Sequence, residues 1–578
     1  MKIEIQENDL NVSVSEIKNE NFVKIFKLTA DNPCNAEIKT VRLVFEAPSK
    51  GAFSVWNPCC EFFRAVMPNW NKTQICSRIS SGAPVQQLIT ADGSNAVNIA
   101  VLDAKTPLNI KTGFVEETGN IQCYIEFFTL PVKKFLHYET WFRIDERKIP
   151  YYDCLADVTK WWETEGGYIR NSVPDIAKMP VYSVWYSFHQ DIDVEKIIEE
   201  CRAAKTLGME SVIIDDGWQT DNNDRGYAYC GDWEVTPAKI PDMAEFVRKI
   251  HNEGLKFILW YSVPFVGIHS KAYKKFEGKF LSFDDKNGYG SLDPRYPEVR
   301  EYLVKLYEKA VLDWDIDGLK LDFIDSFVLE DREKNDEAWD IFSLEEAVEA
   351  LLIEIKKRIY ALKPDFCFEF RQRYVGPAVA TLGNMIRVGD CPGDALKNRV
   401  GSIDLRLISS NSAVHSDMLM WDLKCPAQTA ALQIINTIFA VPQISVMLNE
   451  LPQKHLDMLK FYLDFWIKNR YILLDGKLEA HNPEANYSLV ASHTDDEIIA
   501  AAYSEKMLVL KKDYKRIVII NGTGQSVLVI NSFVSLKVYK CTVRNCFGEI
   551  VCETVLEDTY VLPFDVEPSG IVELIREQ

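Results

Sequence analysis

The feature that most constrains the fold is a regular alternation of short apolar segments with amphipathic segments in the middle of the chain. Each apolar segment has the length of a buried strand, and each amphipathic segment repeats its apolar residues at helical spacing. The strand candidates are residues 180–188, 210–218, 255–263, 318–325, 366–374, 385–391, 413–421 and 443–451. Eight strands, each followed by a helix, predict an α/β fold with a central (β/α)8 TIM barrel.

β-rich segments flank the predicted barrel on both sides. Residues 1 to about 155 consist of short alternating runs such as NVSVSEI and VRLVFEA, which turn residues separate. Residues from about 480 to 578 repeat this pattern in EIIAAAYS, RIVIINGT and QSVLVINSF. We therefore expect an N-terminal β-sandwich over residues 1–160, the barrel over 175–475, and a C-terminal antiparallel β-sandwich over 480–578.

Composition and charge exclude several classes of partner. The formal net charge of −20 repels nucleic acid and anionic membranes, so we expect neither as a partner. The N-terminus MKIEIQENDL has no apolar core of signal-peptide length, and no apolar run is long enough to span a membrane. The 14 cysteines are scattered without a CxxC pair, which excludes a zinc ribbon and indicates free thiols in a reducing cytoplasm.

Polar side chains collect at the late positions of the predicted strands. A strand buried on both sides has no structural use for a carboxylate, because an unpaired buried charge is very costly. The C-terminal strand ends of a TIM barrel form its active site, so these residues are candidates to line a substrate pocket. They are Asp215, Asp216, Trp218, Trp260, Lys320, Asp322, Asp325, Glu369, Arg371, Arg373, Arg387, Asp390, His415 and Asp417.

The segment DWDIDGLKLDFIDSF, residues 313–327, allows three interpretations: a calcium loop, a strand with solvated ends, or a catalytic carboxylate at a strand tip. Asp313, Asp315 and Asp317 match the first half of an EF-hand loop. Its twelfth position, which needs a glutamate, is Ile324. We therefore expect no calcium site and place these three aspartates at the helix-to-strand turn on the lower face of the barrel.

Two carboxylates are candidates for the chemistry. Lys320 and Asp322 are two residues apart and face the same side of their strand, so the lysine would keep the carboxylate ionised; a structural salt bridge is the alternative. Asp390, at the end of strand six, is the second candidate. A pair of carboxylates across a barrel mouth suits glycoside cleavage, in which one attacks the anomeric carbon and the other protonates the leaving oxygen and later activates water.

Other residues suit sugar binding. Asp215 and Asp216 can each accept two hydrogen bonds from sugar hydroxyls. His415 could contact substrate or the acid/base loop, with Asp417 orienting it, or be a hydrogen-bonded structural histidine. Four tryptophans could stack on the apolar face of a sugar ring, although each of them, taken singly, fits a protein core better. These are Trp185, Trp218, Trp233 and Trp260.

Five motifs in order, IIDDGWQ, GDW, GLKLDF, RVGD and AVHSD, resemble glycoside hydrolase family 36, the melibiase or α-galactosidase group with its raffinose-synthase relatives. The resemblance covers nearly the whole chain and implies a retaining mechanism without a metal or other cofactor. It implies that Asp322 of the Lys-x-Asp motif is the nucleophile and that Asp390 is the acid/base, with Asp394 as the fallback because the usual SDNTD reads GDCPGD. It assigns the C4 and C6 hydroxyls of galactose to Asp215 and Asp216.

The chain departs from the family pattern in two places. After strand five the usual Cys/Ser-Gly-Gly stretch, which contacts the C2 substituent, reads FEFRQRYVGP, and on strand three the usual WxEPE reads WYSVPFVG. One hypothesis is that Arg371 or Arg373 reads an acidic or substituted sugar, since guanidinium groups suit carboxylate or sulfate. The alternative is that these arginines pair with Glu369, Asp390 or Asp394.

The leading hypothesis is a cytoplasmic, exo-acting α-galactosidase-type hydrolase whose partner is a small carbohydrate. The alternatives are an α-glycosidase for a modified galactose (N-acetylgalactosamine or an acidic sugar), a raffinose-synthase-type α-galactosyltransferase, and a non-catalytic carbohydrate-binding protein. A phosphate-binding barrel is disfavoured, because the segments WDLKCPAQ and NELPQKH after strands seven and eight have no glycine. Assembly into a homo-oligomer is compatible with the resemblance, although no residue argues for it.

Overall fold

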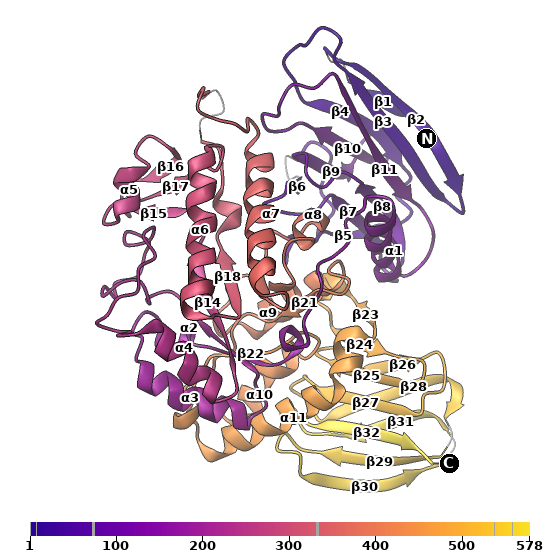
Figure 1. The fold of residues 1–578 in the computed structure, drawn as a ribbon. Helices are drawn as coiled ribbons and strands as arrows, with labels where there is room; N and C mark the ends of the chain where they lie inside the picture. The colour runs from indigo at the N-terminus through magenta and orange to yellow at the C-terminus, as the bar shows by residue number, and fades with distance from the viewer. Residues whose placement is uncertain are drawn as a thin grey trace.

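The computed structural model describes residues 2–6, 9–71, 75–330, 335–536, 538–557 and 559–577, and its centre is an eight-stranded parallel barrel (Figure 1). The barrel strands are β12 (Val181–Ser183), β13 (Ser211–Ile214), β14 (Lys256–Ser262), β18 (Gly318–Asp322), β19 (Cys367–Arg371), β20 (Met385–Arg387), β21 (Ala413–His415) and β22 (Gln443–Ile444). Single parallel bridges, His415 to Val441 and Leu419 to Ile444, close the barrel between β21 and β22. The predicted barrel and its eight strands are confirmed.

The helices that follow these strands form the outer layer. They are α3 (Val194–Thr206), α4 (Met243–Asn252), α6 (Pro297–Trp314), α7 (Leu344–Leu362), the short α8 (Pro377–Ala380), α9 (Ala395–Arg406), α10 (Ala427–Asn436) and α11 (Gln453–Asp475). Side-chain caps mark several of their starts: Asp193 and Asp242 each accept a backbone N–H of the first turn. In the described part of the chain, none of the helices is long and apolar enough to cross a membrane.

One excursion from the barrel is not predicted by the sequence patterns. Between β14 and α6 the chain forms α5 (Lys271–Lys275) and a small sheet of β15 (Phe265–Gly267), β16 (Phe280–Asp284) and β17 (Tyr289–Leu292). Each of these strands has five residues or fewer, which is too short for a period-2 pattern to stand out.

The N-terminal part is a sandwich of two antiparallel sheets with its own apolar core. One sheet contains β1 (Ile3–Ile5), β4 (Val41–Ala47), β10 (Ile121–Phe127), β9 (Leu108–Phe114) and β6 (Ile75–Ser77). The other contains β2 (Asn11–Glu20), β3 (Val23–Asp31), β11 (His137–Asp145), β8 (Asn95–Val101), β7 (Val85–Thr90) and β5 (Ala52–Trp56). Helix α1 (Tyr151–Thr164) leads from this sandwich to the barrel.

The C-terminal part is also built from two sheets (Figure 1). The larger contains β23 (Lys477–His481), β24 (Leu489–His493), β25 (Glu497–Ala502), β27 (Arg516–Asn521), β32 (Ile571–Arg576), β29 (Tyr539–Arg544) and β30 (Ile550–Leu556). The smaller contains β26 (Met507–Leu510), β28 (Val527–Leu536) and β31 (Thr559–Asp565). Most pairs are antiparallel as expected, while β25–β27 and β26–β28 pair in parallel, because each of these connections crosses to the other sheet before it returns.

The aspartates that precede β18 lie where the sequence placed them, at the lower face of the barrel. Asp315 ends α6 in the left-handed conformation (φ 57°). Asp317 accepts the backbone N–H of Phe257 at 3.0 Å and pairs with Lys256 at 2.9 Å and Lys363 at 3.2 Å. Its oxygens are occupied by protein donors, which is how a carboxylate at a strand start is kept ionised.

A buried cluster joins the three parts of the chain. Both oxygens of Asp404 on α9 lie 3.0 Å from Arg64 Nη2, which follows β5. Trp56 Nε1 donates to the same carboxylate at 2.7 Å, and so does the hydroxyl of Tyr487, from the connection between β23 and β24. The Arg64 guanidinium also lies 5.0 Å from the centre of the Tyr487 ring. The N-terminal sandwich is therefore tied to the barrel by a charge pair that is buried from solvent.

We expect an Arg64→Met variant to lose about 3–5 kcal/mol of unfolding free energy, because it leaves the Asp404 carboxylate buried without its cation. The matched control is Arg202→Met. Arg202 pairs with Glu253 at 2.7 Å but is 60% exposed, so its loss should cost less than about 1 kcal/mol. Urea unfolding of both variants measures the difference, and equal losses would contradict the structural role of the Arg64–Asp404 pair.

Candidate active site

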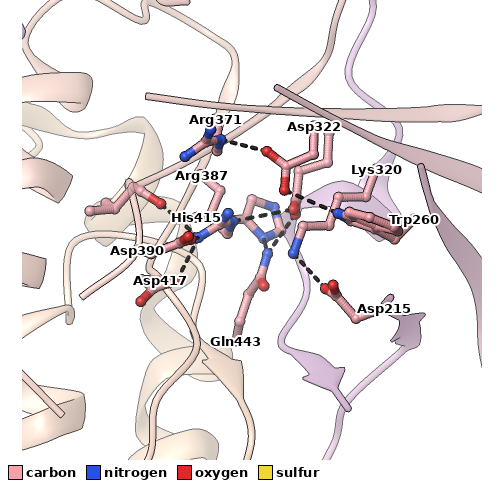
Figure 2. A network of polar contacts seen from close by, with 12 residues as sticks. Asp215, Trp260, Lys320, Asp322, Arg371, Arg387, Asp390, His415, Asp417 and Gln443 are labelled. Carbon is pink, nitrogen blue, oxygen red and sulfur yellow. Dashed lines mark hydrogen bonds and ion pairs between the residues drawn. The ribbon is translucent and has the colours of Figure 1, made fainter. Parts of the chain in front are cut away.

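Asp322 is the last residue of β18 and lies at the C-terminal mouth of the barrel (Figure 2). Its Oδ2 accepts a hydrogen bond from Trp260 Nε1 at 3.0 Å, and its Oδ1 accepts one from the backbone N–H of Phe323 at 2.9 Å. Phe323 has the left-handed backbone conformation (φ 64°) that ends the strand. Two donors from different elements therefore orient the carboxylate before any ligand binds.

Arg371, the last residue of β19, is the cation that contacts this carboxylate. Its Nε lies 2.5 Å from Asp322 Oδ1, and its Nη2 lies 3.4 Å from Asp325 Oδ1. Its guanidinium carbon stands 4.7 Å from the centre of the Phe323 ring. The Arg371 Nε–H is not aligned with the carboxylate as a hydrogen bond, so the contact is an ion pair. A cation and two N–H donors thus engage both oxygens of Asp322.

The two arginines of β19 and its following turn do not pair as the sequence suggested. Arg371 is shared by Asp322 and Asp325. Arg373 pairs with Glu61 of the N-terminal sandwich at 3.6 Å and is 61% exposed. These partners come from segments far away in the sequence, whereas the local pattern had pointed to Glu369, Asp390 or Asp394.

Asp390 follows β20 and reaches the same mouth from the other side of β19 (Figure 2). Arg387 Nη1 lies 2.9 Å from Asp390 Oδ1, and the carboxylate is 54% exposed. Partial burial opposes ionisation of Asp390, but Arg387, with help from Lys320 and Arg371, outweighs it and lowers the pKa to about 2. Asp390 is therefore a carboxylate that is open to the mouth and ionised in the free site.

Asp394, the fallback for the acid/base role, has a structural use of its own. Its Oδ1 accepts the backbone N–H of Lys397 at 2.9 Å, and it is the N-cap of α9. An N-cap aspartate stabilises a helix start without any catalytic task. Asp390 caps no helix and faces the mouth, so the geometry favours Asp390 of the two.

Arg387 lies beneath the mouth rather than facing it, since it is 1% exposed. Its Nη1 lies 2.5 Å from Asp417 Oδ1, and its Nε lies 3.6 Å from Glu369 Oε1. Asp417 also accepts the backbone N–H of Cys391 at 2.7 Å. Arg387 and Asp417 together hold the loop that carries Asp390. A positioning role for Arg387 therefore replaces the direct substrate contact expected from the sequence.

Lys320 pairs with Asp215 rather than contacting Asp322. The distance from Lys320 Nζ to Asp215 Oδ2 is 2.6 Å, and both side chains are buried. Asp215 Oδ1 also accepts the backbone N–H of Asp216 at 2.9 Å. The lysine thus orients the first aspartate of the Asp-Asp-Gly-Trp motif, while Arg371 takes the place beside Asp322 that the sequence spacing suggested for the lysine.

The second aspartate of that motif is held by two amides. Asp216 accepts hydrogen bonds from Gln190 Nε2 at 2.6 Å and from Gln219 Nε2 at 2.7 Å, and burial raises its pKa to about 6. Gly217 follows with φ 116°, and a Cβ there would lie 2.6 Å from the Cα of Gln190. Only glycine fits this close approach, which explains the glycine of the motif.

The tryptophans form a packed wall. Trp218 is fully buried, donates to the backbone carbonyl of Trp260 at 3.0 Å, and stacks with Trp233 at 5.8 Å between ring centres. Trp233 is 5% exposed and Trp260 2%. The expected stacking of a sugar on Trp218 is therefore wrong, because its ring faces are covered by other side chains. Trp260 acts through its hydrogen bond to Asp322.

Sequence reasoning missed the partly exposed aromatic residues of the mouth. The Tyr186 hydroxyl donates to Asp417 Oδ2 at 3.0 Å. Burial and the charge of Asp322 both raise the pKa of Tyr227. Burial and Arg225 lower the pKa of His189. Tyr186 lies in the short helix α2 (Trp185–Phe188), which the sequence pattern had extended as part of a strand, and Tyr227 lies in an irregular segment after β13, where no period marks it.

His415 is part of the barrel interior and has no exposed surface. Its Nε2 lies 2.8 Å from the carbonyl oxygen of Ala177, and its Nδ1 lies 3.2 Å from Nε2 of Gln443. The same Gln443 amide donates to Glu369 at 2.6 Å. This arrangement fits a neutral ring with its proton on Nε2, so the structural alternative for His415 holds. Asp417 contacts Arg387 instead of orienting this histidine.

Comparison with known proteins shows a likeness of the first part of the barrel to one family. Residues 169–360 match the Melibiase family model. Alpha-galactosidase Mel36A of Lactobacillus acidophilus is 26% identical over 164 residues, which is 27% of this chain and 21% of that protein. Alpha-galactosidase AgaA of Geobacillus stearothermophilus is 37% identical over 107 residues, which is 18% of this chain and 14% of that protein. Residues 169–360, which include barrel strands β12, β13, β14 and β18, are therefore similar to the melibiase family.

Solved structures extend the likeness in fold beyond the melibiase segment. The alpha-galactosidase of Lactobacillus brevis matches with a TM-score of 0.66 at 15% identity, covering 100% of this chain and 80% of that one. AgaA in complex with raffinose matches with a TM-score of 0.64 at 13% identity, covering 100% and 86%. The sandwich, barrel and C-terminal β-domain therefore share one architecture with these proteins. The alignments to Mel36A and AgaA as sequences, in contrast, span about a fifth or less of their length.

The segment that matches the melibiase model contains only some of the candidate site residues. Residues 169–360 include Asp215, Asp216, Lys320 and Asp322, and end before β19. Arg371 and Asp390 lie beyond that limit. The half of the mouth that holds Asp322 therefore lies within the segment that matches the family model, and the half formed by β19 and β20 lies outside that segment.

We expect the buried neutral His415 to make stability depend on pH. Burial lowers its pKa from 6.5 to about 4, so between these pH values the unfolded chain binds a proton that the folded chain does not. The unfolding free energy that the neutral His415 contributes is complete above pH 6.5. It is lost as the pH falls toward 4, by about 3 kcal/mol in total. Urea unfolding between pH 4.5 and 7 should show the wild type losing stability toward low pH more steeply than His415→Gln.

The control for this prediction is His269→Gln, which changes an exposed histidine outside the barrel interior. Its curve should run parallel to the wild type. If the His415→Gln curve also ran parallel, the neutral state assigned to His415 would be incorrect.

Proposed function

We propose that this chain is a retaining, exo-acting α-galactosidase-type glycoside hydrolase for short α-galactosides, with Asp322 as nucleophile and Asp390 as acid/base. The observation that carries the proposal is Asp322 itself. It is a carboxylate at the tip of a barrel strand, oriented by two N–H donors, within the segment that matches the melibiase model. Asp390 faces the same mouth from the far side of β19.

The proposed reaction has two steps. In the first, an Asp322 oxygen attacks the anomeric carbon, the bond from that carbon to the leaving oxygen breaks, and Asp390 gives its proton to that oxygen. In the second, Asp390 takes a proton from water, the water oxygen attacks the anomeric carbon, and the bond to Asp322 breaks. Two inversions give a product of retained configuration. Asp215 and Asp216 offer acceptors for the sugar hydroxyls.

The low pKa of Asp390 makes the first step sensitive to the leaving group. Arg387 favours the ionised carboxylate, whereas the first step needs the protonated one. A sugar in the mouth would remove water from Asp390 and so raise its pKa. Leaving groups that are stable as anions depend least on this proton.

A second candidate is an α-glycosidase for a modified galactose. One relative, the A type blood alpha-D-galactosamine galactosaminidase of Flavonifractor plautii, is 26% identical over 172 residues, which is 26% of this chain and 15% of that protein. The observation in its favour is Arg371, which stands beside Asp322 where the family resemblance leads us to expect small residues. Transfer to a sugar acceptor would use the same covalent intermediate, and product analysis with and without acceptor sugars separates it from hydrolysis.

We expect Asp322→Ala to lower kcat on an aryl α-galactoside by at least about 10³-fold, because no covalent intermediate can form. Azide added to this variant should attack from the side vacated by Asp322 and yield the β-galactosyl azide. NMR of the wild-type reaction should show α-galactose as the first product. Unchanged turnover by Asp322→Ala would show that Asp322 is not the nucleophile.

We expect Asp390→Ala to discriminate between leaving groups. Loss of the acid should reduce kcat/KM by about 10²–10⁴-fold for a sugar leaving group and far less for a dinitrophenyl group, which needs no proton. Azide should in this variant yield the α-galactosyl azide, since it attacks the intermediate on the side opposite Asp322. Asp394→Ala is the matched control, and a larger loss in that variant would transfer the acid/base role to Asp394.

A further inference from the structure

A cavity adjoins Asp390 on the side of the mouth where the chain departs from the family pattern. Its volume is about 220 Å³. It lies among the turn after β19, the loop after β20, the first turns of α9 and a loop of the N-terminal sandwich. The charged residues that line it are Glu61, Asp325, Arg371, Arg373, Asp390 and Lys397.

The cavity is preformed, because its outer wall is anchored. Gln372 Nε2 donates to the backbone carbonyl of Pro58 at 2.7 Å, which ties the turn after β19 to the sandwich loop. The buried Arg64–Asp404 pair holds the end of the same loop against α9. A group that enters this cavity therefore meets side chains that are already in place.

The charged residues that line the cavity differ in whether they have an ion-pair partner. Asp325 pairs with Arg371 at 3.4 Å, Asp390 pairs with Arg387 at 2.9 Å, and Glu61 pairs with Arg373 at 3.6 Å. Each carboxylate of the cavity thus has a cation. Lys397 is half-buried at the cavity wall, and in the part of the chain that the structure describes no carboxylate lies within ion-pair distance of it.

We propose that this cavity binds an anionic substituent of the glycoside, a carboxylate or a sulfate, and that Lys397 and Arg371 are the residues that select it. The inference rests on the proposed function, because it is Asp390 that places the cavity beside the leaving oxygen. Lys397 supplies the unpaired charge. Arg371 supplies a guanidinium with several N–H donors, which contacts both Asp322 and Asp325 in the free site.

The position of Arg371 gives a reason for such a substrate. The transition state of glycoside cleavage carries positive charge near the anomeric carbon. A guanidinium 2.5 Å from Asp322 opposes that charge and competes for the attacking carboxylate. An anion in the cavity would neutralise Arg371 and share its guanidinium, which leaves Asp322 freer to attack. A neutral sugar does neither.

The test compares kcat/KM for the 4-nitrophenyl glycosides of galactose, galactose 2-sulfate and galacturonic acid, and for a galactoside with a carboxylate on the nitrophenyl ring. We expect at least one anionic substrate to exceed the neutral galactoside by about tenfold. A gain confined to the sugar-borne anions places the charge on the glycone, and a gain confined to the carboxylated ring places it on the leaving group.

Lys397→Gln should lower the ratio of kcat/KM for the preferred anionic substrate over the neutral one by about tenfold. Lys397→Arg should restore most of that ratio, because it keeps the charge. Arg371→Gln should lower the ratio as well. Lys468→Gln, which removes an exposed lysine of α11, is the control and should leave the ratio unchanged.

Two outcomes overturn the inference while the proposed function stands: the neutral galactoside exceeds every anionic substrate, or the ratio is the same in Lys397→Gln as in the wild type. Failure to cleave any of these glycosides overturns the proposed function itself.

Discussion

The mouth of this barrel depends on the buried guanidinium of Arg387. It lies at the end of β20 with 1% of its side chain exposed, and it faces Asp390, Asp417 and Glu369. Charges taken out of water are tolerated only where opposite charges and hydrogen bonds surround them. Arg387 satisfies that condition for three carboxylates at once, and through Asp417 it also fixes the loop on which Asp390 stands.

Arg371 repeats this arrangement one strand away, since it is the register partner of Arg387 in the β19–β20 pair. Each of the two arginines contacts one of the candidate catalytic carboxylates, and Arg387 lowers the pKa of Asp390. A carboxylate acts as a nucleophile in its ionised form, whereas a general acid must carry a proton. The site is therefore asymmetric: Asp322 is held by the contact of Arg371 with its carboxylate, whereas Asp390 becomes an acid only when a ligand changes its surroundings.

Much of this could be predicted from the sequence, because it follows from local patterns. The eight barrel strands are visible as apolar runs, and Asp322 and Asp390 are conspicuous as carboxylates at strand ends. The ion-pair partner of each charged side chain was harder to predict. Lys320 lies two residues from Asp322 in the sequence but pairs with Asp215, which follows β13 two strands away, and Arg371 takes the position beside Asp322. Trp218 and His415 proved to be interior residues, since a residue type alone does not tell which face of a packed layer it occupies.

The sequence by itself determined the α/β barrel between two β-domains, the side of the barrel on which polar groups gather, and the two carboxylates that stand there. These depend on periodicity and on the high cost of burying a carboxylate in a strand, which are properties of neighbouring residues. Only the tertiary structure decided which cation meets which carboxylate, which aromatic rings stay open, and that a loop of the N-terminal sandwich walls the cavity beside Asp390. Such contacts join residues from 46 to 314 positions apart, and no local pattern encodes them.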